Sequence, residues 1–128
     1  MAGARQYILW QQDNGEIRFA DYWGNWVDTD PIDLRGAFHH AVAIFRGVSG
    51  DAITLDNAEI WVDGENRATH ASGSWSPTDL TAFAIGYDVA FGGSYFQGQM
   101  ALVRIYNRAL SETEVSEHYE AVRGLLGP

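Results

Sequence analysis

The sequence predicts an all-β fold, in which two antiparallel sheets pack face to face and a short helix follows at the C-terminal end. Short runs of β-forming residues alternate with turn signals along most of the 128 residues. Hydrophobic residues make up 46% of the chain and aromatic residues 13%, which argues against disorder and supplies a core. One helical pattern follows residue 110, so strands must form the layers.

The first predicted element is a hairpin. Residues 7–10 form a short apolar run, and residues 16–20 alternate polar and apolar side chains, with Ile17 and Phe19 on one face. Asp13-Asn14-Gly15 lies between them and is a turn signal, because Asn and Gly tolerate positive φ.

A loop and a strand follow this hairpin. Aromatic residues in the segment 21–33 lie among aspartates, and Pro31 would interrupt a ladder, so we expect a loop with one short strand at Trp26 and Val27. Residues 38–45 read as a strand that places alternate residues on one face. These are Phe38, His40, Val42 and Ile44.

The central region predicts a second hairpin and a short strand. Residues 58–62 are a strand candidate, and Asp63-Gly64 should turn it back onto residues 67–70. Residues 72–79 read as a polar loop, residues 83–86 as a short strand, and residues 87–95 as a loop rich in glycine and aromatic residues.

The C-terminal region predicts a strand and then a helix. Residues 97–106 carry clustered β-formers after Gly98. Ser111 and Glu114 have the spacing of a capping box, Leu110 can pack on Val115, and Gly124 is placed to cap the helix in a left-handed conformation. An apolar stripe at helical spacing should face a sheet; it consists of Val115, Tyr119 and Val122.

Three segments of the chain resemble one known family. They are Tyr95-Phe96-Gln97-Gly98 followed by residues 103–111 (VRIYNRALS), the segment 38–43 (FHHAVA) and the segment 60–64 (IWVDG). In this order they resemble the laminin G-like branch of the concanavalin A-like lectin/glucanase superfamily, over about residues 36–123. The resemblance implies a two-sheet jelly roll over a single domain, residues 1–128, most often a module that binds sugars or protein partners.

Two departures from the family pattern predict self-association. The family's opening strands have no counterpart before Tyr7, so we expect a chain shortened at its N-terminus, with a sheet edge left uncovered. Ala101-Leu102 stands where the family commonly has an acidic pair, and apolar residues there suit a buried contact. We therefore expect a homo-oligomer.

Composition excludes several partners. The net charge of −9 repels phosphate backbones and anionic lipid, so nucleic acid is not expected. No apolar run reaches the roughly 18 residues of a membrane helix, and the first residues lack the apolar core of a secretory signal. The chain has no cysteine, and its compartment stays open although the family is often secreted or on the cell surface.

Aromatic residues in the predicted loops are candidates for sugar stacking, since a flat ring can cover the apolar face of a sugar. Trp23 and Trp26 are the first choices, because polar groups flank them; the alternative is that half or more of these rings belong to the core. The predicted ligand-binding residues are Tyr22, Trp23, Asn25, Trp26, Trp75, Tyr87 and Tyr95, with Phe91 in the same loops.

Asp28 and Asp30, close to Asp33, allow two interpretations. Clustered carboxylates on a loop are the ligands that calcium prefers, and many family relatives bind calcium at a sheet rim. The alternative, which we favour, is a set of solvated acids that form turns. Calcium is thus the one cofactor to test.

Catalysis is not expected. Glu59 to Glu65 echoes the glucanase pattern of alternating acids, yet Trp61 takes the middle position and Asp63 is better used in a turn. His39 and His40 are adjacent on a strand and cannot chelate one metal together. The sequence thus predicts a non-catalytic module that binds carbohydrate. The alternatives are a protein-assembly module that associates with itself through a sheet edge and, third, a glycoside hydrolase.

Overall fold

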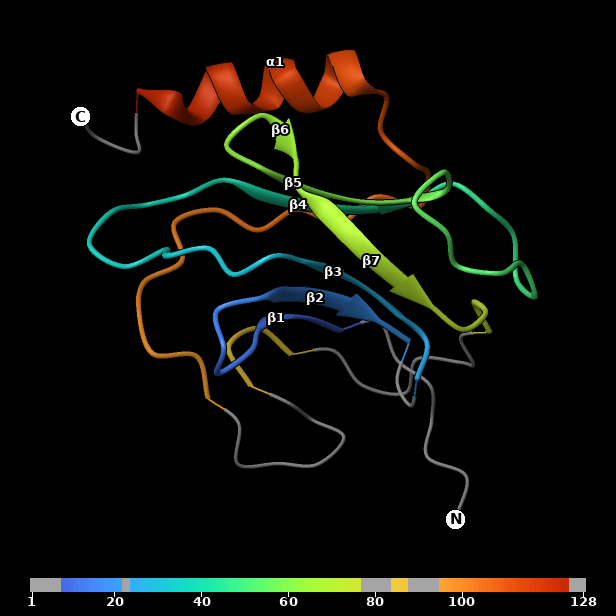
Figure 1. Ribbon diagram of the computed structural model, residues 1–128. Helices are drawn as coiled ribbons and strands as arrows, with labels where there is room; N and C mark the ends of the chain where they lie inside the picture. Colours follow the sequence, from blue (N-terminus) through green and yellow to red (C-terminus); the bar gives the residue numbers. More distant parts are fainter. Residues whose placement is uncertain (1–7, 22–23, 77–83, 88–94, 125–128) are drawn as a thin grey trace.

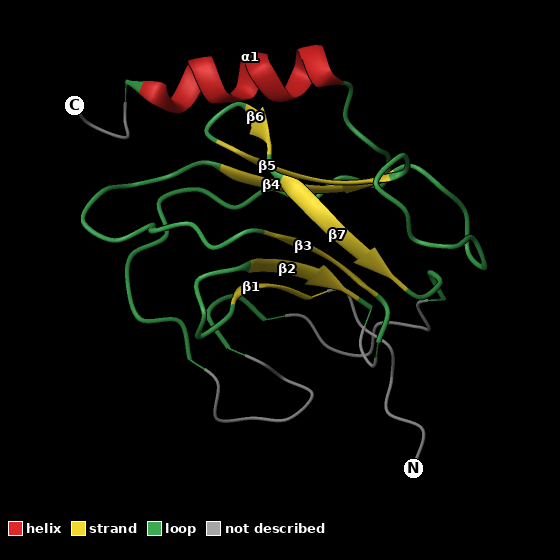
Figure 2. Ribbon diagram, viewed as in Figure 1, coloured by secondary structure: helices red, strands yellow, loops and turns green. Residues whose placement is uncertain are grey.

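The computed structural model is a β-sandwich with one helix on its outer side (Figure 1). It describes residues 8–21, 24–76, 84–87 and 95–124. Strands form the two layers, and loops connect them at both ends (Figure 2). The predicted fold class, an all-β antiparallel jelly-roll sandwich with a short C-terminal helix, is confirmed.

The larger sheet has four strands in the order β1-β2-β3-β7. They are β1 (Ile8–Gln11), β2 (Ile17–Ala20), β3 (Trp26–Thr29) and β7 (Ala68–Ser72). The predicted hairpin is confirmed: β1 pairs with β2, and Gly15 has the positive φ of 89° that its turn requires. The short strand expected at Trp26 is also confirmed, although it extends to Thr29.

The smaller sheet has the order β4-β5-β6, with β4 (Ala41–Phe45), β5 (Ala58–Val62) and β6 (Glu65–Asn66). Asp63 (φ 51°) and Gly64 (φ 82°) both lie in the left-handed region, as a two-residue hairpin turn requires. The prediction that residues 67–70 pair with β5 is wrong. So tight a turn places Glu65 opposite Val62, and after Arg67 the chain leaves for the other sheet, where β7 pairs with β3.

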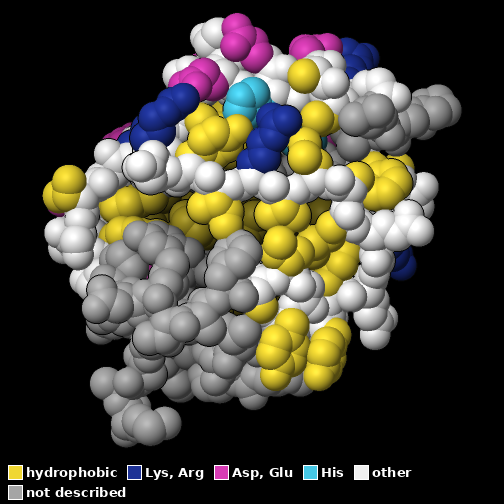
Figure 3. All heavy atoms as spheres, turned by 180° about the vertical axis from the view of Figure 1, so that it is seen from behind, with side chains coloured by type: hydrophobic (Ala, Val, Ile, Leu, Met, Phe, Trp, Pro, Cys, Tyr) yellow, Lys and Arg dark blue, Asp and Glu magenta, His cyan; other side chains and the backbone are white. Residues whose placement is uncertain are grey.

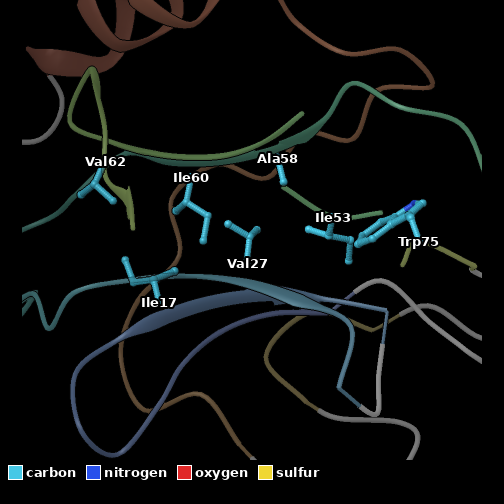
Figure 4. Packing of buried hydrophobic residues seen from close by; sticks show 7 residues of the cluster. All are labelled: Ile17, Val27, Ile53, Ala58, Ile60, Val62 and Trp75. Carbon is cyan, nitrogen blue, oxygen red and sulfur yellow. The ribbon is translucent and has the colours of Figure 1, made fainter. Parts of the chain in front are cut away.

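The core lies between the two sheets (Figure 4). Ile17 and Val27 point into it from the larger sheet, and Ala58, Ile60 and Val62 point into it from β5. Such alternation follows from the period of two along each strand. Ile53 and Trp75, from the connecting segments, close one end of this cluster.

Helix α1 (Glu112–Arg123) begins as predicted. Ser111 Oγ accepts a hydrogen bond from the Glu114 backbone N–H, and the Glu114 carboxylate accepts one from the Ser111 N–H, each at 3.1 Å. The guanidinium of Arg108 also bonds this carboxylate, and together these donors lower the pKa of Glu114 to about 2. The expected left-handed cap is wrong: Gly124 has a φ of −66°, within the right-handed helical region.

The helix covers the outer face of the smaller sheet. Val115 and Leu110 pack with Ile44 and Trp61, and the ring of Tyr119 stacks on His40 with centroids 6.1 Å apart. The apolar stripe therefore faces a sheet, as predicted. Among the described residues, no helix has the length and hydrophobicity to cross a membrane.

Residues 97–106 do not form the strand that their composition predicts. No ladder pairs them in the described part of the chain, and all ten residues are exposed. The strand expected at 83–86 is also absent from its described residues, 84–86. A single bridge joins the next residue, Tyr87, to Tyr95. A segment with high β-propensity forms a strand only when a neighbouring strand is hydrogen-bonded to it, and no strand is bonded to these residues in the described part of the chain.

Candidate ligand-binding face

A row of polar and aromatic side chains crosses the outer face of the larger sheet. The strand registers pair Trp10 with Arg18, Arg18 with Asp28, and Asp28 with His70. Side chains at paired positions project from the same face of a sheet. Since their sequence neighbours Phe19 and Val27 pack into or against the core, this row projects outward.

Arg18 organises this face. Its Nε and Nη2 donate to the two carboxylate oxygens of Asp28 at 2.7 and 2.6 Å. The hydrogen bond to Asp28 raises the pKa of Arg18, which therefore stays charged. The Asp28 side chain is 4% exposed and that of Arg18 is 23% exposed, so water screens this pair only in part.

The guanidinium of Arg18 also lies over two indole rings. Its central carbon is 4.3 Å from the ring centroid of Trp26 and 5.9 Å from that of Trp10, both within the range of cation–π attraction. We call Trp10, Arg18 and Trp26 the tryptophan–arginine platform. Nη1 of Arg18 has no partner among the described residues and can donate to a ligand.

The platform adjoins the loop between β2 and β3, and the base of this loop is fixed. The Asp21 N–H donates to the Asn25 carbonyl at 3.1 Å, which closes the loop. Asp21 Oδ2 accepts from the Ser76 N–H at 2.8 Å, and Asn25 Oδ1 accepts from the Ser74 N–H at 3.0 Å. Asn25, predicted to bind ligand, thus anchors the loop with its side-chain amide oxygen. Tyr22 and Trp23, at the centre of the loop, lie outside the described residues.

Gly73 shows how closely the two segments approach. A Cβ at this position would collide with Asn25 Oδ1 and with the backbone around Gly24. Its φ of +82° also strains any other residue. The loop that continues into the platform is therefore held against the segment after β7.

Trp75 lies in the core and not at a binding surface. It is 3% exposed, and its ring packs against Phe19 and Phe45 with centroid distances of 5.0 and 4.7 Å. It has no free face for a sugar, so its position corrects the stacking role predicted for it and matches the core alternative.

Tyr87 and Tyr95 form a separate aromatic pair. Their rings are 5.0 Å apart beside an antiparallel bridge, and both are exposed. Within the described residues no ring contact joins this pair to the platform. Phe91 lies outside the described residues.

The two acids considered for calcium are differently placed. Both oxygens of Asp28 are bonded to Arg18, whereas Asp30 is exposed and accepts from Thr69 Oγ1 at 3.2 Å. His70 Nδ1 lies 4.0 Å from the same oxygen of Asp30. In the described parts of the chain, no three His, Cys, Asp or Glu side chains come together as a metal site. This geometry gives calcium no support at Asp28.

The acids considered for hydrolysis also have structural partners. Arg46 Nε donates to Glu59 at 2.9 Å, and Asp63 accepts from the His40 N–H at 2.9 Å while its other oxygen lies 2.6 Å from His39 Nδ1. Trp61, between them, is covered by Leu110 and Val115. Glu59 is also 7% exposed, and burial with an arginine partner is the arrangement of a structural ion pair.

A hollow of about 520 Å³ lies between the β1–β2 turn and the segment 31–35. Gln11 Nε2 donates to the Ile32 carbonyl at 2.9 Å, and the Ile32 N–H donates to the Gly15 carbonyl at 3.0 Å, so the two walls hold each other. None of its described lining residues is aromatic. It is a weaker candidate for sugar stacking than the platform.

Sequence reasoning missed Trp10 and Arg18. Their signal was present in the predicted hairpin, since a turn at residues 13–15 brings residue 10 opposite residue 18. An arginine opposite a tryptophan in a two-strand register indicates a cation–π pair on one face.

Comparison with protein-family models agrees with the fold. The family model Laminin_G_3, described as the concanavalin A-like lectin/glucanases superfamily, matches residues 1–116. No curated protein matches significantly. A 2.1 Å crystal structure of residues 221–444 of an S-layer domain-containing protein from Clostridium thermocellum is similar, with 21% identity and a TM-score of 0.48. The match covers 92% of this chain and 58% of that one, so this chain spans less than two thirds of that length.

Proposed function

This chain belongs to the concanavalin A-like lectin/glucanases superfamily, and on that premise we propose that it is a non-catalytic binding module whose ligand is a carbohydrate. We treat residues 1–128 as one domain. The observation that carries the proposal is the tryptophan–arginine platform on the outer face of the larger sheet. Calcium is not part of it.

The platform has the two features that sugar recognition needs. Trp10 is 36% exposed, so part of its ring is free to cover the apolar face of a pyranose. Arg18 lies over that ring and keeps Nη1 without a hydrogen-bond partner among the described residues, so a sugar hydroxyl can accept from it. Because Asp28 fixes the guanidinium, little side-chain entropy is lost when a ligand binds.

Charge favours a neutral sugar as the ligand. The chain carries a net charge of −9, and the positive charge of Arg18 is already compensated by Asp28. An acidic sugar would meet repulsion from the whole molecule without gaining an unpaired cation at the site. Neutral glycans avoid this cost.

Loop residues complete the proposed site. Tyr22 and Trp23 follow the anchored Asp21, and a fixed loop base is how proteins present aromatic side chains to a ligand. We include both on sequence grounds. The exposed pair Tyr87 and Tyr95 is a second candidate stacking surface, separate from the platform.

A printed array of neutral oligosaccharides, followed by calorimetry with the best-bound glycan, tests the proposal. We expect Trp10→Ala to weaken binding at least about tenfold, or ~1.4 kcal/mol, because it removes the exposed stacking face. Trp26→Ala should weaken it as well, because it removes the ring contact that helps Asp28 to orient the guanidinium.

The matched control is Phe38→Ala. Phe38 is 37% exposed, close to the 36% of Trp10, but it precedes β4 of the other sheet. It should leave glycan affinity unchanged. Thermal unfolding checks that each variant is folded. Equal losses from Trp10→Ala and Phe38→Ala, or no binding to any neutral glycan, would reject the platform as a sugar site.

A second candidate function is assembly with a protein partner, a further copy of this chain included. The observation that favours it is the exposed, unpaired segment of residues 97–106. Exposed apolar stretches of this kind are common at protein interfaces and uncommon elsewhere on monomers.

A further inference from the structure

The segment of residues 97–106, which we call the edge segment, has the composition of a strand but no strand partner. None of its residues makes a hydrogen bond within the described part of the chain. All ten residues are exposed, and backbone N–H and C=O groups without a partner can bond an extended chain. The edge segment is thus open to strand addition.

The edge segment is also strongly apolar. Met100, Leu102, Val103, Ile105 and Tyr106 are each between 41% and 70% exposed. Seen from behind the view of Figure 1, hydrophobic side chains gather across this side of the molecule (Figure 3). Burial of such side chains is the main source of free energy in an interface.

The surroundings of the edge segment orient a partner. In an extended chain, Leu102, Arg104 and Tyr106 share one face. The ring of Tyr106 stacks on His118 of α1 with centroids 5.8 Å apart, so this face lies toward the helix. Val103 and Ile105 belong to the opposite face.

Charge indicates the chemistry of the partner. Arg104 is the single charged residue of the edge segment and has no ion pair among the described residues. Arg18, Arg46 and Arg108, by contrast, are each paired with an acid. A cation without an acid in a chain of net charge −9 favours an acidic residue on whatever covers it.

A second copy of this chain does not supply that acid from the same segment. Residues 97–106 contain no Asp or Glu, so two paired edge segments would each leave Arg104 uncompensated. Each copy also carries a charge of −9, which opposes association.

We propose that the edge segment binds an extended polypeptide strand from outside this chain, apolar along its length, with an acidic side chain opposite Arg104. Backbone hydrogen bonds would supply affinity, and Arg104 would select the acid. This inference deepens the second candidate function and does not depend on carbohydrate binding.

The experiment pans a displayed library of random peptides, about ten residues long, against the intact protein and its variants. We expect the wild type to select alternating β-forming peptides with a central Asp or Glu. Arg104→Glu should select Lys or Arg instead, and lose the original peptides by at least about tenfold in affinity. Val103→Pro should select none, because it removes a backbone donor from an exposed position.

The matched control is Arg67→Glu. Arg67 makes no ion pair among the described residues either, but it lies at the crossover between β6 and β7. The same change of charge there should leave the selected peptides unchanged. Hydrogen exchange with a selected peptide bound should protect the amides of residues 99–106.

Several outcomes would overturn the proposal. One is a wild type that selects no peptide, and another is a set of peptides that does not change with Arg104→Glu. A third is a dimer at micromolar concentration whose residues 99–106 are protected without peptide, since a second copy would then be the occupant. Trp10→Ala should retain peptide binding, so failure here is distinct from failure of the carbohydrate proposal.

Discussion

At the scale of single residues, two buried polar groups show how partners decide what a side chain can do. Asp28 is almost fully buried and tolerates burial because Arg18 bonds both of its oxygens. The same pairing occupies both Asp28 oxygens, which a calcium ion would otherwise need as ligands. His40 has the opposite situation, because its Nδ1 is buried without a hydrogen-bond partner in the described structure.

His40 gives a prediction about pH. Burial lowers the pKa of His40, and the nearby charges of His118 and Arg104 lower it further, while Asp63 acts in the opposite direction. The unfolded chain has the higher pKa, about 6.5, and therefore binds the proton first. The contribution of neutral His40 to the free energy of unfolding should be fully present above that pH. It should be lost as the pH drops through about 6.5 toward the pKa of the folded state.

Urea unfolding between about pH 8 and pH 5.5 measures this effect. His40→Gln keeps a neutral polar side chain under Tyr119 and cannot titrate, so its stability should depend less on pH over that range. Parallel pH profiles for the wild type and the variant would contradict the assignment to His40.

At the scale of elements, two local features stabilise helix α1: its capping box and its contact with the β5–β6 turn. Ser111 begins the helix, and Gly64 lets the turn approach Tyr119. The sequence indicates both features, the first by the spacing of a capping box and the second by an Asp-Gly pair. Each supports a separate prediction.

Ser111→Ala should lower the free energy of unfolding by about 1 kcal/mol, because the Glu114 N–H loses its acceptor. Chemical denaturation measures the change. Ser116→Ala is the matched control: Ser116 is exposed in the interior of the helix, where alanine is favoured, so stability should stay level or rise slightly. Equal losses at both serines would show that the cap contributes nothing.

Gly64→Ala should cost more than Gly50→Ala. Both glycines have positive φ, 82° and 97°, and share that backbone strain. A Cβ on Gly64 would also come within 2.8 Å of the Tyr119 ring, whereas nothing lies within 4 Å of one on Gly50. We expect an extra loss of roughly 1 kcal/mol at Gly64 from displaced packing, measured as the difference between the two urea midpoints. No difference would place Tyr119 away from the turn in solution.

At the scale of the whole molecule, sequence patterns of a few adjacent residues predicted the turns, strands and helix start that depend only on those residues. The β1–β2 turn, the strand at Trp26 and the start of α1 each follow from a few adjacent residues. Pairing across the chain was less accessible. Propensity alone predicted a strand at residues 97–106, but a ladder also needs a bonded neighbour.

The candidate site divides in the same way. Trp26 was found because aromatic residues among polar ones are visible in the sequence, but its partner Arg18 needed the register of β2 and β3. Trp75 shares the composition of a surface aromatic and lies in the core, because its segment folds back over Phe19 and Phe45. Composition proposes such residues, and only the arrangement of strands separates a ligand contact from a packed ring.

The crossover at Arg67 has a consequence for how the protein comes apart. Arg67 still donates its N–H to Ile60 in the smaller sheet, and the next residue, Ala68, already pairs with Thr29 in the larger one. Two adjacent residues near the middle of the chain are thus bonded to different sheets, and the peptide bond between them links the two layers. Unfolding one sheet would therefore disrupt the other at this position. We expect the two sheets to unfold in one cooperative transition and not one after the other.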